Sequence, residues 1–355
     1  MDRSNVLTVS LLTILMFLVA TAVAGTETKV LYTYGTVHYN HYLLYRGFMM
    51  YDHDWIDTSW LQQSDFDRIK QLGFNTVNFN FFWTSFEDSE YNAGVYNQDR
   101  LTRLENVINM ARAAGLKVIL SNRVTFAGNT ADYRGWLNDY GPNGWEMAFT
   151  EPLLSRLCNW IRYLLVNFPQ IEGLEPVNYP LHRRTADDRD LYYNVLPRLI
   201  SEYRSVSDKP YFLSSVHKQA KYLVDAPAPP DNCILVIDGY GHTPFYKCTQ
   251  TYDPSMFDDI INGTGGFTQP FVEAITYSER YGVPIFVDEF GTYSSCCDNE
   301  DRLQWMTDLL TWFEQHNISW THHYGWSSQV GTLLDETTHT VAKPKTLALL
   351  AEYAS

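Results

Sequence analysis

Residues 284–291 read Pro284-Ile-Phe-Val-Asp-Glu-Phe-Gly291, and this short apolar run ends in two carboxylates and a glycine. The apolar part, residues 284–287, is typical of a strand that is buried on both faces of a parallel sheet. A carboxylate at the end of such a strand is costly to bury unless it has a function. Glu289 is therefore the first candidate for a functional residue.

Similar apolar runs recur along the chain and alternate with amphipathic stretches. Strands are expected at residues 43–49, 76–82, 117–121, 173–178, 211–215, 233–238, 284–287 and 319–324. Helices are expected at residues 65–72, 99–114, 152–167, 187–206, 270–281, 299–316 and 346–353. This order predicts an α/β fold, a single (β/α)8 TIM barrel whose active site lies in the loops after the strands.

Two parts of the predicted barrel depart from a regular repeat. Residues 29–39 are expected to form a small N-terminal hairpin that plugs the amino-terminal end of the barrel. The fifth unit is the weakest, because residues 216–224 leave room for only a short helix. Nothing in the composition separates a second domain, so residues 25–355 are expected to form one barrel.

The first 24 residues resemble an export signal. Arg3 precedes an uncharged apolar stretch at residues 6–23, and Ala22-Val23-Ala24 is a small-x-small pattern that a signal peptidase cleaves. Cleavage after Ala24 predicts a secreted, extracellular protein with no membrane attachment. The alternative is an uncleaved anchor, since about 18 apolar residues can just span a bilayer.

Composition narrows the class of partner. The chain has 355 residues, with 41 acidic and 26 basic side chains and a formal net charge of −15. Such a surface repels nucleic acids and anionic membranes. Aromatic residues make up 15% of the chain, and some of these rings can offer flat faces to a sugar. We expect a monomer that needs no cofactor.

The five cysteines do not follow a zinc-binding pattern. Cys158 and Cys233 lie on an expected helix and an expected strand, which favours buried thiols. In an oxidising compartment, Cys248 is expected to form a disulfide with Cys296 or Cys297, because both segments follow neighbouring strands at the same end of the barrel.

Four segments together resemble glycoside hydrolase family 5, a family of retaining β-glycosidases, over about residues 46–326. They are Arg46-Gly47-Phe48, Gly73-Phe74-Asn75-Thr76-Val77 followed by Trp83, Gly173-Leu-Glu-Pro-Val-Asn-Tyr-Pro180 and the segment 284–291. The resemblance implies a glycosidase in which two carboxyl groups about 5 Å apart act as nucleophile and acid/base. It assigns the nucleophile to Glu289.

The acid/base position departs from the family. There the fourth strand ends in Asn-Glu-Pro, whereas this chain has Asn178-Tyr179-Pro180. A phenol, with a pKa of about 10, is a weaker proton donor than a tuned carboxylic acid. Activity is therefore expected to be weak or altered, and Asn178 is expected to bind the sugar 2-hydroxyl.

Other positions of the expected site are also rebuilt. Asn78 stands where the family has an arginine that braces the nucleophile, and Arg123 is a candidate for the missing cation. The resemblance assigns substrate contacts to these two residues and to a further set: Trp83, Asn178, Tyr240, His242 and Trp326.

Another carboxyl group, or a histidine, could supply the proton that the family's acid/base residue would donate. Glu175 is expected to lie too deep, because four residues at about 3.3 Å each separate it from Tyr179. Better placed candidates are Glu87, Asp88, Glu90, Asp132, Asp238 and His242. No metal site is expected, because His322 and His323 should point to opposite faces of a strand.

The sequence thus leaves three functions open. The first is a retaining β-glycosidase or β-glycanase that acts on a β-linked oligo- or polysaccharide of the glucan or mannan class. The second is a catalytically silent, carbohydrate-binding barrel, favoured by the loss of the acid. The third is an extracellular scaffold protein.

Overall fold

The computed structural model describes most of the barrel and leaves out several connecting segments. The described residues are 32–34, 37–39, 44–51, 61–87, 94–123, 153–178, 191–215, 218–224, 226–240, 249–265, 271–292, 296, 298–323 and 339–354. The expected export signal at residues 1–24 lies outside them. Within this part of the chain, no helix is both long and apolar enough to cross a membrane.

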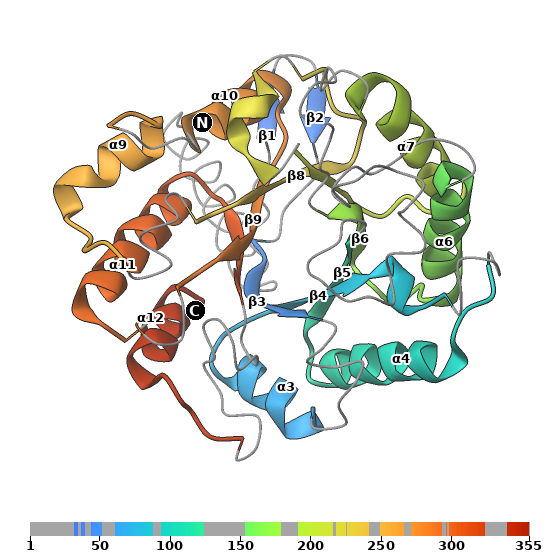
Figure 1. The fold of residues 1–355 in the computed structure, drawn as a ribbon, viewed down its shortest axis with the longest axis horizontal. Coiled ribbons are helices and arrows are strands. Elements are labelled where there is room, and N and C mark those ends of the chain that lie inside the picture. The colour runs from blue at the N-terminus through green and yellow to red at the C-terminus, as the bar shows by residue number, and fades with distance from the viewer. Residues whose placement is uncertain are drawn as a thin grey trace, which may run out of the picture.

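Eight parallel strands close into a barrel, as the sequence predicts (Figure 1). Around the barrel each strand pairs with the next one in the chain, and β10 closes the ring by pairing with β3. The strands are β3 (Arg46–Tyr51), β4 (Thr76–Phe82), β5 (Lys117–Arg123), β6 (Gly173–Asn178), β7 (Tyr211–Ser214), β8 (Cys233–Asp238), β9 (Ile285–Phe290) and β10 (Ser319–His323).

Helices surround the barrel and cover its outer face (Figure 1). They are α3 (Gln63–Gln71), α4 (Gln98–Ala113), α6 (Leu153–Asn167), α7 (Leu196–Arg204), α9 (Phe257–Asn262), α10 (Phe271–Tyr281), α11 (Glu300–Gln315) and α12 (Pro344–Ala354). The short α9 was not expected from the sequence. A single π-helical turn, η4 (Leu191–Val195), leads into α7.

The N-terminal hairpin is present as β1 (Tyr32–Tyr34) and β2 (Val37–Tyr39), which pair in antiparallel orientation. Strand β1 contacts α10.

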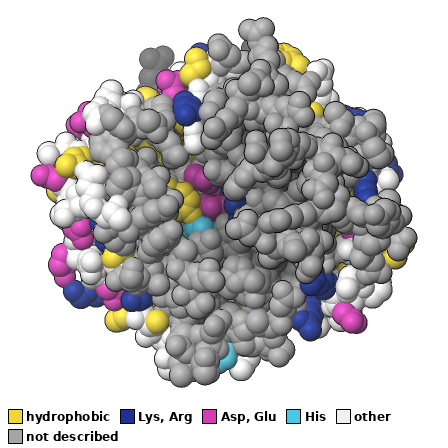
Figure 2. All heavy atoms as spheres, viewed as in Figure 1, with side chains coloured by type: hydrophobic (Ala, Val, Ile, Leu, Met, Phe, Trp, Pro, Cys, Tyr) yellow, Lys and Arg dark blue, Asp and Glu magenta, His cyan; other side chains and the backbone are white. Residues whose placement is uncertain are grey.

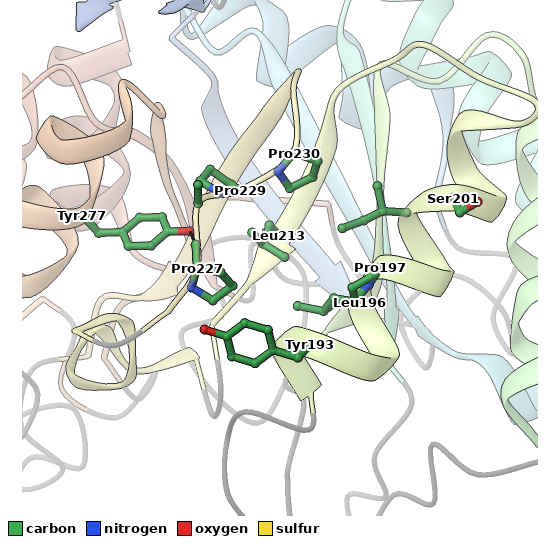
Figure 3. A pocket seen from close by; sticks show the side chains of 11 residues that line it. Tyr193, Leu196, Pro197, Ser201, Leu213, Pro227, Pro229, Pro230 and Tyr277 are labelled. Atoms are coloured by element: carbon green, nitrogen blue, oxygen red, sulfur yellow. Dashed lines mark hydrogen bonds between the residues drawn. The ribbon is translucent and has the colours of Figure 1, made fainter. Parts of the chain in front are cut away.

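In the described part of the fifth unit, the helix is a short 3-10 helix, η6 (Ala220–Leu223), as the length of the unit predicts. A cavity of about 480 Å³ lies beside this unit on the outer face of the barrel. Figure 3 shows Leu213 of β7, Tyr193 and Tyr277 around it, together with the proline-rich segment 227–230. Because Leu213 and Ser214 alternate along the strand, this cavity is separated from the polar interior that Ser214 faces.

The interior of the barrel has an apolar layer below a polar one. Six buried side chains form the apolar layer: Tyr45, Ile119, Phe212, Ile234, Val236 and Phe286. The polar layer lies toward the carboxyl ends of the strands, where the expected catalytic residue is also found. Burying polar groups there requires that they contact one another, since water is largely excluded.

Candidate functional site

Strand β9 carries a β-bulge that places two carboxylates in the barrel. From Val287 to Glu289, β9 advances by two residues while β8 advances by one, and the pairing with β10 shifts at the same point. Asp288 is thus an extra residue relative to both neighbours. Regular alternation would turn Asp288 away from Glu289, but a bulge re-aims side chains. Both carboxylates contact Lys218.

Neighbouring strands satisfy the carbonyl groups of the bulge. The Thr321 hydroxyl donates to the Asp288 carbonyl oxygen at 2.6 Å, and the Gly239 N–H donates to the Glu289 carbonyl oxygen at 2.6 Å. Gly291 follows with a φ of 143°, where a Cβ atom would lie 2.8 Å from His322 Nε2. The glycine that ends the sequence motif is therefore required by the backbone and by the adjacent ring.

Glu289 lies at the centre of a network of polar side chains and is only 4% exposed. Its Oε1 is 2.8 Å from Lys218 Nζ, and its Oε2 accepts from the Tyr240 hydroxyl at 3.3 Å. His323 Nε2 lies 3.8 Å from Oε2, and the Tyr240 hydroxyl also bonds to His323 Nδ1. In Figure 2, acidic and histidine side chains lie together near the middle of the face over the barrel.

The ionisation of Glu289 follows from these contacts. Burial alone would raise the pKa of this carboxyl, but the Lys218 ammonium, with Arg123 nearby, holds the pKa well below its usual range. The lowered pKa favours the anionic form of Glu289. A carboxylate that is anionic and directed into the barrel can act as a nucleophile.

Lys218 is a cation of the site that no sequence motif indicates. It follows β7 in a turn, its side chain is fully buried, and its Nζ is 2.5 Å from Asp288 Oδ2 and 3.6 Å from Asp238 Oδ1. Burial alone would lower the pKa of its ammonium, but the surrounding carboxylates raise the pKa well above the usual value. The only signal in the sequence was a lysine three residues after the expected strand at residues 211–215.

The pKa values of Asp238 and Asp288 shift in the opposite direction to the pKa of Glu289. Burial raises the pKa of both carboxyl groups well above the usual value, and neighbouring carboxylates add to the effect. Asp238 ends β8 and pairs with Glu289 across the two strands. Its side chain is 9% exposed, so it is less buried than that of Asp288. The site therefore holds a carboxylate whose pKa is lowered next to a carboxyl group whose pKa is raised.

Strand β6 brings a further carboxyl group to the site through a second bulge. From Glu175 to Asn178, β6 advances by three residues while β5 advances by two. Asn178 Nδ2 donates to Glu175 Oε2 at 2.8 Å and to Asp288 Oδ2 at 3.3 Å, and the Ser214 hydroxyl bonds to Glu175 Oε1. Glu175 thus contacts Asn178 of the site, whereas its expected depth relative to Tyr179 concerns a residue outside the described ones. The rise per residue of a regular strand does not apply across a bulge.

The other two candidates on neighbouring strands have separate surroundings. Asn78 of β4 is buried, and its Oδ1 accepts from the Ser121 hydroxyl at 2.7 Å. Arg123 ends β5, and its guanidinium lies over the Phe82 ring at 5.6 Å. Its positive charge also lowers the pKa of Glu289. Arg123 thus contributes positive charge, whereas the direct ion pair to Glu289 comes from Lys218. Substrate contacts by Asn78 and Arg123 stay a prediction.

The two consecutive histidines of β10 lie in different environments, as alternation along a strand predicts. His322 packs against Phe48 and Phe290, and burial lowers its pKa to about 3. His323 faces Tyr240, and burial lowers its pKa well below the usual value. Both rings are therefore neutral. Among the described residues, no group of three or more His, Cys, Asp or Glu side chains is arranged to hold a metal ion.

Trp83 and Glu87 form a packed unit after β4. Glu87 is buried, accepts from the Gly94 N–H at 3.0 Å and pairs with Arg156 at 2.6 Å. The Arg156 guanidinium lies over the Trp83 ring at 5.9 Å, and Trp83 is 5% exposed. Glu87 thus links the backbone of Gly94 to the side chain of Arg156. Substrate contact by Trp83 stays a prediction.

Several predicted residues lie outside the part of the chain that the structure describes. They are Tyr179, His242, Trp326, Asp88, Glu90, Asp132, Cys248 and Cys297. Cys158 and Cys233 are free and buried. The structure thus brings together Asn178, Tyr240 and Glu289 of the predicted site and adds Lys218, Glu175 and Asp288. The disulfide of Cys248 stays a prediction.

Comparison with known proteins confirms the resemblance to glycoside hydrolase family 5. The family model for cellulase, glycosyl hydrolase family 5, matches residues 38–148. Cellodextrinase A of Ruminococcus flavefaciens is 20% identical over 297 residues, which cover 78% of this chain and 84% of that protein.

Solved structures share the barrel. A GH5-4 broad-specificity endoglucanase from Clostridium acetobutylicum has a TM-score of 0.70 at 16% identity, over 87% of this chain and 97% of that one. Endoglucanase Cel5A from Thermotoga maritima has a TM-score of 0.67 at 19% identity, over 86% of this chain and 96% of that one. The latter enzyme has also been solved with a mannotriose substrate. At these identities the likeness shows the fold.

Proposed function

We propose that this chain, which resembles glycoside hydrolase family 5 in sequence and barrel fold, is a retaining β-glycosidase that hydrolyses O-glycosyl bonds. One observation carries the proposal: Glu289 is an anion at the carboxyl end of β9, with Lys218 at Oε1 and Tyr240 at Oε2. In barrels of this type the reaction takes place at that end. The family match and the curated relative support the same activity.

The proposed reaction has two steps. Glu289 attacks the anomeric carbon, the glycosidic C–O bond breaks, and a glycosyl ester forms on the carboxylate. Water then hydrolyses the ester and restores Glu289. The departing oxygen needs a proton in the first step, and water must lose one in the second. Both transfers require an acid/base group on the other side of the bond.

The acid/base group determines which substrates react quickly. The resemblance places Tyr179 there, and a phenol is a poor acid at neutral pH. Among the described residues, Asp238 is the best substitute because it lies beside Glu289, is partly exposed and has a raised pKa. We propose weak turnover of natural glycans, with Asp238 supplying the proton.

The substrate class follows from the relatives. The similar structures are endoglucanases, and one has been solved with mannotriose. We propose a β-linked glucan or mannan as the substrate. The negative charge of the chain is compatible with a neutral polysaccharide.

Secretion is part of the proposal. Residues 1–24 resemble a cleavable export signal, and a polysaccharide too large to enter a cell requires an extracellular enzyme. Expression of the full chain in a secreting host, followed by N-terminal sequencing, tests this. A mature protein beginning at Gly25 supports it, whereas an uncleaved, membrane-bound product contradicts it.

The decisive experiment is intact mass after incubation with an activated 2-fluoro-β-cellobioside or 2-fluoro-β-mannoside. A stable adduct needs a nucleophile but little help from an acid, so it forms even where turnover is slow. We expect one adduct per chain, located on the peptide that contains Glu289 and missing in Glu289→Gln. If neither reagent gives an adduct, the proposed hydrolase function is wrong, and a catalytically silent, carbohydrate-binding barrel is the better account.

A further inference from the structure

Lys218 has no counterpart among the residues that carry the resemblance, yet it contacts more carboxylates than any other described side chain of the site. Its Nζ bonds to Asp288 Oδ2 at 2.5 Å and to Glu289 Oε1 at 2.8 Å, and lies 3.6 Å from Asp238 Oδ1. No part of its side chain is exposed. A buried ammonium group is retained only where carboxylates surround it.

The backbone of Lys218 is strained in a way that directs it to this position. Its φ is 53°, in the left-handed region, which costs roughly 1–2 kcal/mol for a residue with a Cβ atom. The Lys218 N–H donates to the Ser215 carbonyl oxygen at 2.8 Å, which holds the backbone of Lys218 close to the end of β7. Such strain persists where the surrounding structure fixes it, and it often marks functional sites.

The groups around Lys218 come from five strands. Glu175 of β6, Asp238 of β8, and Asp288 and Glu289 of β9 supply the carboxyl groups. Arg123 of β5 adds one cation, and His323 of β10 is neutral because burial lowers its pKa. Carboxyl groups therefore outnumber cations, and only those closest to a cation can be anionic at the same time.

We propose that Lys218 is the positioning residue for Glu289: its ammonium group supplies the positive charge that this buried carboxylate needs to stay anionic, and it fixes the orientation of the carboxylate at Oε1. The role in catalysis rests on the proposed function, whereas the effect on Glu289 does not. Lys218 does not contact the sugar in this scheme, and acts only through Glu289.

Lys218→Met tests the proposal because methionine keeps an unbranched apolar side chain and removes the charge. The rate of 2-fluoro adduct formation should fall at least ten-fold at about pH 6, and its pH profile should gain an acidic limb where Glu289 becomes protonated. Lys218→Arg, which keeps the charge, should keep the parent profile even if its rate changes. Lys221→Met, at an exposed position three residues on, should match the parent.

A second variant covers the case in which Lys218→Met does not fold. Removal of the ammonium leaves Asp288 and Glu289 without their common partner, which is strongly destabilising. Lys218→Met combined with Asp288→Asn removes the ammonium group together with one of the two carboxyl groups that bond to it. This double variant should fold and should still show the acidic limb.

The titration of Glu289 separates this proposal from the proposed function. Carbon-13 NMR of the glutamate side-chain carboxyl groups, with Glu289→Gln for assignment, reports the pKa of Glu289 without any substrate. A clear upward shift of that pKa in Lys218→Met, or in the double variant, supports the positioning role. An unchanged titration of Glu289, or faster adduct formation in the variant, overturns the positioning role. A parent protein that forms no adduct overturns only the proposed hydrolase function.

Discussion

The Asp288 carbonyl oxygen accepts a 2.6 Å hydrogen bond from the Thr321 hydroxyl on the neighbouring strand. Asp288 is the extra residue of the β9 bulge, so no regular ladder partner serves this oxygen. A side chain of β10 thus satisfies the group that the bulge removes from the ladder. This contact keeps Asp288 and Glu289 directed toward Lys218.

Thr321→Val is expected to destabilise the protein, because it leaves a buried carbonyl group without a partner while keeping the shape of the side chain. The loss should be about 1–3 kcal/mol in the free energy of unfolding, measured in urea. The rate of 2-fluoro adduct formation should also fall, since Glu289 follows Asp288 directly.

Thr307→Val is the matched control for this substitution. The Thr307 hydroxyl donates at 2.8 Å to the Leu303 carbonyl oxygen, which already belongs to helix α11. Its replacement should cost a few tenths of a kcal/mol. Equal losses at the two positions would show that the bulge does not depend on Thr321.

The barrel was predictable because its strands follow local patterns. Expected strands at residues 76–82, 173–178 and 233–238 have the observed bounds, and each is a short segment rich in apolar residues that lies between turn signals. The expected strand at 284–287 instead extends to Phe290. Charged residues 288 and 289 suggested an end, but the barrel interior accommodates them through Lys218.

The site was only partly predictable, because its geometry depends on bulges and long-range contacts. Glu289, Asn178 and Tyr240 follow from motifs at strand ends. Lys218 contacts Glu289 across 71 positions in the chain and belongs to no motif. Side-chain alternation, which correctly separates His322 from His323, fails at Asp288 because a bulge changes the phase of the strand.

Asp238→Asn tests the proposed proton donor. General acid catalysis typically raises the rate by a factor of about 10² to 10⁴. The rate of hydrolysis of unactivated glycans should therefore decrease by a factor in that range. Aryl glycosides with good leaving groups need no proton, and their first step should change only a few-fold. Similar losses on both substrates would show that Asp238 acts by some means other than proton donation.

Asp238→Asn is also expected to change how the stability of the protein depends on pH. The raised pKa of Asp238 means that the folded protein holds a proton which the unfolded chain releases, between the ordinary carboxyl pKa and the raised one. The free energy of unfolding therefore falls as pH rises through that window. Asp238→Asn should flatten this dependence and raise the melting temperature most at neutral and alkaline pH.

Asp231→Asn is the control for the pH dependence, because Asp231 is exposed and precedes the other end of the same strand. Its melting temperature should follow that of the parent at every pH. If Asp238→Asn also follows the parent, the carboxyl group of Asp238 titrates normally and is a poor candidate for the acid.

The predicted disulfide of Cys248 can be mapped directly. Peptides from the unreduced protein, expressed in a secreting host, should contain Cys248 linked to Cys296 or Cys297. Cys158 and Cys233 should react with an alkylating reagent only after unfolding, because both are buried and free. Removal of a native disulfide costs about 2–5 kcal/mol, so Cys248→Ser should lower the melting temperature. Recovery of Cys248 as an alkylated thiol would contradict the pairing.

Tyr179→Glu returns a carboxyl group to the position that the resemblance assigns to the acid/base. Activity on unactivated β-glycans should rise, by up to the 10² to 10⁴ that an acid typically supplies. The gain should be smaller if Asp238 already supplies the proton, so Tyr179→Glu in the Asp238→Asn background should show the larger increase.

The pH profile identifies the cause: a restored acid adds a basic limb near pH 6 to 7. Because Lys218 keeps Glu289 anionic, the acidic limb should stay in place. Tyr179→Gln, which has the same shape without the acid, should show no gain, and a gain equal to that of Tyr179→Glu would show that removal of the tyrosine, rather than the new carboxyl group, raises the rate.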